Sequence, residues 1–466
     1  MTSTVRTEKD SLGSEEVAGD RYWGASTERC LRLFQLGDRM PHAVIHAFGA
    51  QKKAAAKANA RFGLLPHDIA SVLVEVAGEV ACGHLDDHFP LSLWQTGSGT
   101  ATNMNVNEVI ANRANEKLGA ALGTKSPVHP NDHVNMGQST NDSFGTVMHV
   151  AALQKMHQEL FPALDAFIGA FIKKRDSFGE HIKIGRTHLQ DAAPLRVSDE
   201  WNAFINTLCG AKKRLDASVE ALLTLPQGGT AVGTGLNAHP WFAETFAQFL
   251  SEDLDYTFKV HPSPFHLMSM HDDCVALSND LMILAGDLTK IANDLRFLSC
   301  GPRAGIDELM LPQNEPGSSI MPGKVNPTQI ESTLMVCVQV QGLGSAVLAA
   351  GSSGQLQLNV MKPLIIANVL KMMTLLAETM NSLRSCCVEG ITLNEPVTGM
   401  YVSESLMLVT GLAPHIGYDK ATQLTQHAFN HKCSLKDAAR VLGFVSEDDF
   451  DAWVDPAKMA RPHQGA

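Results

Sequence analysis

A row of apolar residues with heptad spacing constrains the fold of this chain more than any other feature. The positions alternate in steps of four and three, the spacing of an a/d seam sustained over about three heptads. Such a seam predicts one long helix that packs lengthwise against other helices. The row consists of Leu277, Leu281, Leu284, Leu288, Ile291, Leu295 and Leu298.

Three further stretches of similar length are rich in apolar residues, at residues 143–160, 330–348 and 364–383. No strand-like alternation of comparable strength lies between them, and aromatic residues make up only 6% of the chain. Because β-sheets favour aromatic and β-branched residues, this balance favours helices. We therefore predict an all-α protein with a central bundle of long helices. Apolar residues on several faces of these helices predict oligomerisation.

Polar segments divide the helical pattern into three predicted domains. Boundaries near Gln138 and Asn394 separate an N-terminal helical domain (residues 1–138) from a central long-helix domain (139–395) and a small C-terminal helical domain (396–466). The length of 466 residues fits this division, because single domains usually span about 100–200 residues.

The charge balance and the cysteines disfavour several classes of partner. Lysines and arginines number 37 against 49 aspartates and glutamates, and the net charge of −12 argues against nucleic acids and anionic membranes. Residues 1–10 carry no apolar signal core, and we expect no membrane-spanning segment. The nine cysteines are scattered without a C-x-x-C pair, which is typical of reduced thiols. We expect a cytoplasmic protein.

The segment 317–327, with the sequence GSSIMPGKVNP, combines two adjacent serines, a lysine and an asparagine. Its glycines and prolines exclude an ordinary helix across the segment. A helix is predicted to start at its end, with Asn326 as N-cap and Gln329 as the capping-box partner. A helix N-terminus and the ammonium group of Lys324 both attract anions. The segment therefore predicts a grip for a small carboxylate beside a mobile serine.

Four other polar loops interrupt the helical pattern, at residues 95–105, 129–142, 185–191 and 228–237. Residues 139–142 precede a helical stretch and are better explained, taken alone, as N-cap chemistry. Residues 96–100 form either a turn into the next helix or part of a site. Residues 228–235 superficially resemble a phosphate-binding loop. They lack the Gly-Lys-Ser/Thr sequence, which disfavours nucleotide binding.

Several histidines are candidates for chemistry. His188 lies among hydroxyl, amide and carboxylate neighbours and is a candidate acid–base group, although a lone histidine is more often structural. The pairs His84/His88 and His129/His133 have the four-residue spacing of metal ligands on a helix. Neither pair comes with a third ligand at motif spacing, so we predict no metal site. Together, the hydroxyl and amide clusters suit a small polyanionic substrate.

The segment 317–327 resembles the signature loop of the fumarase/aspartase superfamily. Within that superfamily the chain is similar to the class II fumarases over nearly its whole length. The similar segments include residues 6–10, 23–25, 94–100, 103–105, 128–132 and 404–410. Aspartate ammonia-lyases typically carry Gln in place of His188 and Ala in place of Gly323. These two positions favour a hydratase.

The resemblance implies an all-α homotetramer with three domains per chain and active sites shared between subunits. It implies the reversible, stereospecific hydration of fumarate to L-malate through an aci-carboxylate intermediate, a reaction of the tricarboxylic acid cycle. It implies neither a metal nor another cofactor. The expected partner is a small dicarboxylate, fumarate or L-malate, and neither a nucleic acid nor a membrane.

The resemblance also implies roles for individual residues. Ser318 is the expected base that removes the C3 proton, His188 is the second acid–base group, and Glu331 is the expected partner of that histidine. The residues expected to bind the substrate are Ser98, Gly99, Thr100, Ser139, Thr140, Asn141, Thr187, Ser319, Lys324, Val325 and Asn326. A secondary anion site is expected at His129, Pro130, Asn131 and Asp132.

Some positions depart from the usual pattern of the family. Thr140 stands where a second serine is common, Met136-Gly137 replaces Lys-Ser, and Ser126 stands where some members carry an arginine. The departures leave an alternative open, an ammonia-lyase or a hydratase of a related dicarboxylate such as aspartate or mesaconate. A catalytically silent protein with the same fold is disfavoured, because Ser318 and Lys324 are both present.

Overall fold

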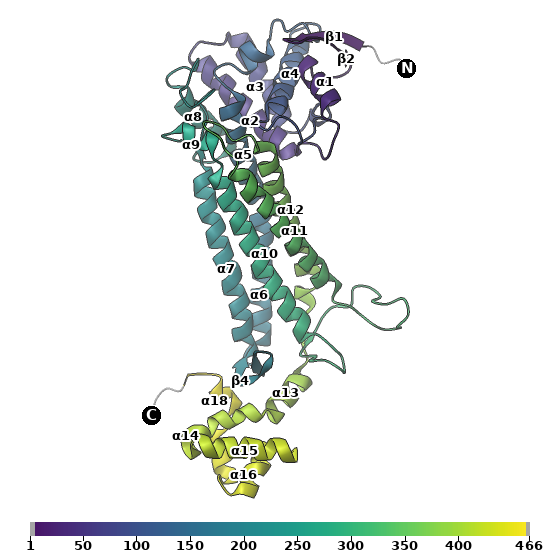
Figure 1. Ribbon diagram of the computed structural model, residues 1–466, viewed down its shortest axis with the longest axis vertical. Coiled ribbons are helices and arrows are strands. Elements are labelled where there is room, and N and C mark those ends of the chain that lie inside the picture. Colours follow the sequence, from purple (N-terminus) through teal and green to yellow (C-terminus); the bar gives the residue numbers. More distant parts are fainter. Residues whose placement is uncertain (1–4, 463–466) are drawn as a thin grey trace. The chain divides into compact units, whose positions relative to one another are not determined.

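The chain folds almost entirely into α-helices, as the computed structural model shows for residues 5–462 (Figure 1). The strands that it contains form four pairs, each a two-stranded sheet of its own. The predicted all-α class is therefore confirmed. The first four residues of the predicted N-terminal domain and the last four of the C-terminal domain lie outside the described residues.

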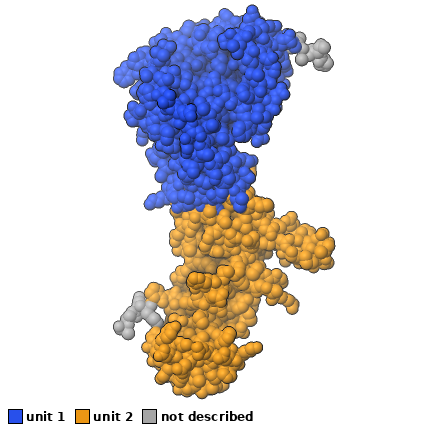
Figure 2. Space-filling view, in the orientation of Figure 1, with its two compact units in different colours: residues 1–162, 212–285, 338–377 blue, residues 163–211, 286–337, 378–466 orange. Residues whose placement is uncertain are grey.

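The chain divides into two compact units (Figure 2). Unit 1 comprises residues 1–162, 212–285 and 338–377, and unit 2 comprises residues 163–211, 286–337 and 378–466. Five long helices contribute residues to both units. They are α6 (Phe161–Phe178), α7 (Val197–Leu222), α10 (Asp272–Leu298), α11 (Thr328–Gly351) and α12 (Lys362–Cys386). The division into three domains stays a prediction.

Helix α10 contains the heptad row from which the fold was predicted. Each of its seven apolar residues, from Leu277 to Leu298, is buried, whereas Ile283 between them is 45% exposed. The predicted long helix and its buried seam are therefore confirmed. The stretches predicted near residues 143–160, 330–348 and 364–383 are also helical.

Unit 1 is built around α2 (His42–Arg61), which packs against α3 (His67–Ala81), α5 (Thr140–Lys155) and α8 (Phe242–Leu254). Small residues allow this approach, since a Cβ atom on Gly49 would lie 2.3 Å from the backbone nitrogen of Ala81. The remaining elements of unit 1 are β1 (Val5–Asp10), β2 (Gly13–Ala18), α1 (Ala25–Leu33), η1 (Asp86–His88), α4 (Thr100–Lys117), η2 (Pro130–Val134), η3 (Met156–Leu160), β5 (Thr224–Leu225), β6 (Lys259–Val260) and α9 (Pro264–Ser269).

Unit 2 contains a β-hairpin that the sequence did not predict. Strands β3 (Ile182–Thr187) and β4 (Gln190–Arg196) pair antiparallel across residues predicted to form a polar loop. Ile184 of this hairpin joins a core cluster formed by the C-terminal helices. The other elements are β7 (Leu309–Met310), η4 (Val388–Gly390), β8 (Thr392–Leu393), α13 (Glu395–Glu404), η5 (Leu406–Gly411), α14 (Ala413–Ile416), α15 (Tyr418–His431), α16 (Leu435–Leu442), α17 (Glu447–Trp453) and α18 (Pro456–Met459).

Two helices are long and apolar enough to cross a membrane by length and composition alone, Thr328–Gly351 and Lys362–Gly390. No such helix is expected from uninterrupted apolar runs, because polar residues interrupt both segments. The core helix of a soluble protein meets the same criteria, and 67% of the apolar window of the second helix is buried. Only 33% of the window in α11 is buried, so a largely apolar helix remains exposed in the single chain.

Candidate active site

The loop before α4 places two hydroxyls at the N-terminus of that helix. Ser98 Oγ and Thr100 Oγ1 lie 2.8 Å apart and share one hydrogen bond. Gly99, the N-cap residue, has φ +84, and a Cβ atom there would lie 2.1 Å from the ring of Phe144. Glycine is required at this position for both reasons. Residues 96–100 therefore form a turn into a helix and also present an exposed group of donors. The two interpretations of this segment are compatible.

The N-terminus of α5 forms a capping box, which confirms the structural interpretation of residues 139–142. Ser139 Oγ accepts a hydrogen bond from the backbone of Asn141, and the backbone of Ser139 donates to Asp142 Oδ1 at 3.0 Å. Thr140 follows as the first helical residue and is buried. Its Oγ1 accepts a hydrogen bond of 2.9 Å from Asn103. The proton of the Thr140 hydroxyl is therefore left to donate to another group.

The N-termini of α4 and α5 meet through direct contacts. Asn103, in the first turn of α4, bonds to Thr140 of α5, and Gly99 lies against Phe144 of α5. The positive ends of two helix dipoles thus converge beside the hydroxyls of the two loops. Unit 1 therefore brings together six of the predicted substrate-binding residues, Ser98, Gly99, Thr100, Ser139, Thr140 and Asn141. Such a group of donors suits a carboxylate.

Lys362 holds the same two loops together, although it is not among the residues predicted for the site. Its backbone nitrogen donates to Gly97 O at 3.1 Å, and its Nζ donates to Asn141 O at 2.7 Å. The side chain is fully buried. The sequence offers one indication of this role, because Lys362 is a charged residue placed directly before Pro363 and an apolar helix. A buried ammonium group there is costly unless it has partners, so its position implies a specific function in the fold.

A buried carboxylate lies behind the two loops. Asp142 accepts hydrogen bonds of 3.0 Å from Gln227 Nε2 and from the backbone nitrogens of Gly228 and Thr230, in addition to Ser139. Burial raises the pKa of Asp142, and these N–H groups oppose the rise. The glycine-rich segment that resembled a phosphate loop therefore binds an anion of the protein itself.

Two buried lysines are influenced by this carboxylate. Burial lowers the pKa of Lys52 and of Lys362 to about 7 each, and the charge of Asp142 opposes the decrease. Lys52 Nζ donates to Asn135 Oδ1 at 3.0 Å and to Gln138 Oε1 at 2.9 Å. The polar loops of unit 1 thus rest on a buried network of charges and amides.

The hairpin of unit 2 presents His188 at its tip. His188 and Leu189 have φ +56 and +59, which is uncommon for residues other than glycine, and both are exposed. Buried ion pairs fix the first strand of the hairpin, since Lys183 and Arg186 each lie 2.7 Å from a carboxylate oxygen of Glu308. Thr187 is exposed beside His188. The imidazole is thus presented on a rigid support.

The loop between α10 and α11 carries the predicted base (Figure 1). Its ends are held together, because Gly317 N donates to Lys324 O at 2.9 Å and Asn326 Nδ2 donates to Gly317 O at 2.6 Å. Ser318 Oγ accepts hydrogen bonds from the backbone nitrogens of Ile320 and Met321, at 3.2 and 3.0 Å. Ser319, Lys324 and Val325 are exposed.

The predicted capping box at the start of α11 is wrong. Helix α11 begins at Thr328, and the backbone of Glu331 donates to Pro327 O. The amide of Asn326 closes the preceding loop instead of capping the helix. The side chain of Gln329 accepts a hydrogen bond from Ser382. The amide of Asn326 closes the loop at Gly317 and does not form a local cap, and sequence spacing alone does not reveal this preference.

The catalytic residues expected in unit 2 are not bonded to one another within the chain. Across residues 5–462, no hydrogen bond or ion pair links the side chain of His188 to Glu331 or to Ser318, and none involves the ammonium group of Lys324. Glu331 is exposed in the first turn of α11. Within the single chain, the side chain of His188 therefore has neither Glu331 nor Ser318 as a partner.

The predicted secondary anion site lies at η2. His129 Nδ1 accepts hydrogen bonds of 3.2 Å from the backbone nitrogens of Asn131 and Asp132, and Pro130 is buried as the first residue of η2. His133 Nδ1 accepts from His129 N in turn. His88 Nδ1 likewise accepts from Tyr22 N. In both histidine pairs considered for metal binding, backbone groups thus occupy a ring nitrogen.

A cavity of about 270 Å³ lies beside the hairpin of unit 2. Its cationic lining residues are already paired, Lys183 and Arg186 with Glu308 and Lys290 with Asp294. Cations that face carboxylates offer little to an anionic substrate. The hydroxyl-bearing loops therefore suit an anionic ligand better than this cavity does.

Comparisons with known protein families agree with the fold and the site. Residues 13–342 match the family described as "Lyase", and residues 408–461 match the family described as "Fumarase C C-terminus". The first match covers most of the helices that carry polar loops. The fold and the site thus define a member of the all-α lyases.

Individual relatives narrow this class. The class II fumarate hydratase 2 of Bradyrhizobium diazoefficiens is 50% identical over 98% of this chain and 97% of its own length. The class II fumarate hydratase of Thermus thermophilus is 48% identical over 99% of each chain. The crystal structure of class II fumarase from Schistosoma mansoni superposes with a TM-score of 0.96, at 41% identity, over 99% of this chain and 100% of the other. The chain belongs to the class II fumarate hydratase family.

The lowered pKa of Lys362 predicts a pH-dependent stability. Between about pH 7 and the unfolded pKa near 10.5, the unfolded chain binds a proton at this position that the folded chain lacks. The contribution of Lys362 to the stability is therefore lowest below about pH 7 and increases as the pH rises through this window. We expect the unfolding free energy of the wild type, minus that of Lys362→Met, to increase by about 1.4 kcal/mol per pH unit. Urea unfolding between about pH 7 and 9 measures this difference.

An exposed lysine provides the control for this measurement. Lys259→Met, in β6, should give a difference from the wild type that stays constant over the same pH range. A constant difference for Lys362→Met as well would show that Lys362 carries the same charge in both states.

Proposed function

We propose that this chain catalyses the reversible hydration of fumarate to L-malate. The observation that carries the proposal is the meeting of two helix N-termini, with their hydroxyls, at Asn103 and Thr140. We infer that the ligand of these donors is fumarate or L-malate, because the chain belongs to the class II fumarate hydratase family. Relatives with that name align with nearly the whole chain.

The reaction requires the removal of a weakly acidic C3 proton of malate. The charge then moves into the adjacent carboxylate, which becomes a dianionic aci-form. Preorganised donors and a cation stabilise such an intermediate. The exposed ammonium group of Lys324 is available for this function, as is the second N–H of Asn326, whose first N–H bonds to Gly317. Ser319 and Val325 would contact the substrate beside them.

Ser318 is proposed as the base. A serine hydroxyl is a poor base in water and needs donors that stabilise its alkoxide. The backbone nitrogens of Ile320 and Met321 already donate to Ser318 Oγ. An alkoxide would be held by the same two N–H groups, in the manner of an oxyanion hole. This geometry supports the assignment better than the sequence alone did.

His188 is proposed as the acid–base group for the hydroxyl that enters or leaves, acting through water. Glu331 would hold its orientation and raise its basicity. Ser98, Thr100, Ser139, Thr140, Asn141 and Thr187 would bind the carboxylates, and Gly99 would allow the close approach of the backbone. Fumarate and L-malate carry the charge to which these donors are matched, and no step requires a metal.

We also propose that four copies assemble and share active sites. Helix α11 supports this, because exposed residues follow alternating four- and three-residue steps along one face. They are Glu331, Met335, Val338, Gly342, Ser345 and Ala349. A seam of apolar and small residues packs against other helices. Glu331 begins this seam, so it would meet His188 of another copy. The nine free thiols support a cytoplasmic location.

An assay of three substrates tests the function. Absorbance of the conjugated double bond should increase rapidly with L-malate and not with L-aspartate or with the hydrated form of mesaconate. Signal with L-aspartate alone would indicate an ammonia-lyase, and signal with the methylated substrate alone would indicate a related hydratase. Absence of signal with each of them would contradict the proposal.

Ser318→Ala should lower kcat by about 100- to 10,000-fold, because the base is lost while the donors remain. Binding of a dicarboxylate analogue, followed by calorimetry, should change little. Ser177→Ala removes a hydroxyl that bonds only to the backbone at the exposed end of α6, and it serves as the control with wild-type kcat. A kcat for Ser318→Ala within about tenfold of the wild type would exclude the serine as base.

Val338→Glu should dissociate the tetramer and remove activity, because a carboxylate would be buried in each α11 seam. Light scattering coupled to size-exclusion chromatography measures the mass. Val441→Glu is the matched control, since Val441 is 65% exposed on α16 and Val338 is 74% exposed on α11. A tetrameric and fully active Val338→Glu variant would place the interface elsewhere.

A further inference from the structure

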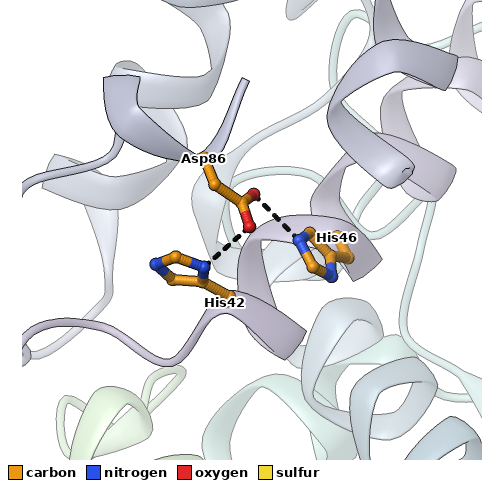
Figure 3. A group of neighbouring side chains, drawn as sticks. All are labelled: His42, His46 and Asp86. Carbon is orange, nitrogen blue, oxygen red and sulfur yellow. Dashed lines mark hydrogen bonds and ion pairs between the residues drawn. The ribbon is translucent and has the colours of Figure 1, made fainter. Parts of the chain in front are cut away.

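Helix α2 begins with two histidines on one face, beside an aspartate from a distant segment (Figure 3). His42 and His46 are one turn apart, and Asp86 is the first residue of η1. His42 Nδ1 lies 2.7 Å from Asp86 Oδ2, and His46 Nε2 lies 2.9 Å from Asp86 Oδ1. All three groups belong to unit 1. None of the three is among the residues proposed for substrate binding or catalysis.

We propose that His42, His46 and Asp86 form a binding site for one divalent transition-metal ion of the Zn²⁺, Co²⁺ or Ni²⁺ type. One ligand atom from each residue lies within 4.8 Å of the other two, and among the described residues this is the group of histidines, cysteines and carboxylates that meets that condition. Two imidazoles and one carboxylate favour these ions over Mg²⁺ and Ca²⁺, which prefer oxygen ligands.

The two rings already face the same carboxylate, each through one nitrogen. In the absence of an ion, each ring nitrogen that faces Asp86 donates a proton to it, which requires the Nδ1–H form of His42 and the Nε2–H form of His46. When an ion binds, each ring would carry its proton on its other nitrogen, and the nitrogen that faces Asp86 would give its lone pair to the ion. The rings therefore need little rotation to bind it, and the cost of ordering them is already met by the fold.

The backbone leaves room beside the ligands. Gly83 has φ +78, and a Cβ atom there would lie 3.1 Å from His46 Nε2 and 3.3 Å from Asp86 Oδ2. A side chain at residue 83 would crowd the ion, and glycine does not. The side chains of His42, His46 and Asp86 are 50%, 33% and 29% exposed. Water can therefore reach the ion and complete its coordination.

Within residues 5–462, the other pairs of histidines four residues apart lack this arrangement. In the pairs His84/His88 and His129/His133, backbone N–H groups occupy ring nitrogens. His427 and His431 stack at 4.1 Å on α15, and Nδ1 of His431 contacts a backbone carbonyl. The pair on α15 thus has the same four-residue spacing without a carboxylate between the rings, and it provides a matched control.

The ion would connect the start of α2 to η1, two segments about forty residues apart in the sequence. Binding to the folded chain alone stabilises the fold by mass action. We therefore expect a structural ion that raises the melting temperature and takes no part in the hydration reaction.

Metal titration of the untagged full-length protein, first stripped with a chelator, tests the site. Calorimetry with Zn²⁺ should give one ion per chain, and Co²⁺ should give visible absorption bands typical of nitrogen and oxygen ligands. Zn²⁺ should raise the melting temperature by roughly 2 °C or more. In His42→Ala and Asp86→Asn the affinity should fall at least about tenfold and the temperature shift should disappear. His427→Ala should behave as the wild type.

Circular dichroism and melting in chelator show whether each variant is folded, so that lost binding can be distinguished from lost structure. If His42→Ala does not fold, the milder Asp86→Asn and His46→Gln variants give the same comparison. Absence of binding by the wild type at roughly 100 μM free Zn²⁺ would overturn the proposal. Equal affinity in the wild type and in folded Asp86→Asn would overturn it as well.

Discussion

The polar half of unit 1 depends on the buried carboxylate of Asp142. This one group receives hydrogen bonds from the start of its own helix and from the glycine-rich segment that contains Gly228 and Thr230. It also attracts the buried ammonium groups of Lys52 and Lys362. Without Asp142, nothing would oppose the effect of burial on the pKa of either lysine, and both would lose their charge more readily.

Lys362 connects this buried network to the two hydroxyl-bearing loops. Its side chain fixes the start of α5 through Asn141 O, and its backbone fixes the loop before α4 through Gly97 O. The hydroxyls of the two loops are consequently positioned before a ligand arrives. Donors that need no reorganisation stabilise developing charge more strongly than mobile ones. The proposed groups of unit 2 differ, because Ser318 lies in an exposed loop and His188 on an exposed hairpin tip.

The sequence predicts what depends on local pattern. The spacing from Leu277 to Leu298 predicts α10 and its burial, because a seam of apolar residues has one stable arrangement. The capping box at Ser139 is also local, since its partners lie three residues apart. The glycines and prolines of residues 317–327 likewise predict an irregular loop.

Features that depend on distant residues were missed. The hairpin at β3 and β4 is stabilised by Glu308, more than a hundred residues away, and its strands show little apolar alternation. The function of Lys362 depends on Gly97 and Asn141, which are remote in sequence. The start of α11 was misplaced because Asn326 bonds back across the loop to Gly317. Long-range partners decide these cases, and spacing carries no information about them.

The departures from the family pattern are explained by backbone contacts. Met136 contributes its carbonyl oxygen, which accepts hydrogen bonds from Asn59 and Gln138. Gly137 has φ +69, a conformation that favours glycine. The oxygen of Thr140 is held by Asn103 as that of a serine would be, and its branched side chain restricts rotation. These changes alter the support of the site and keep its donors.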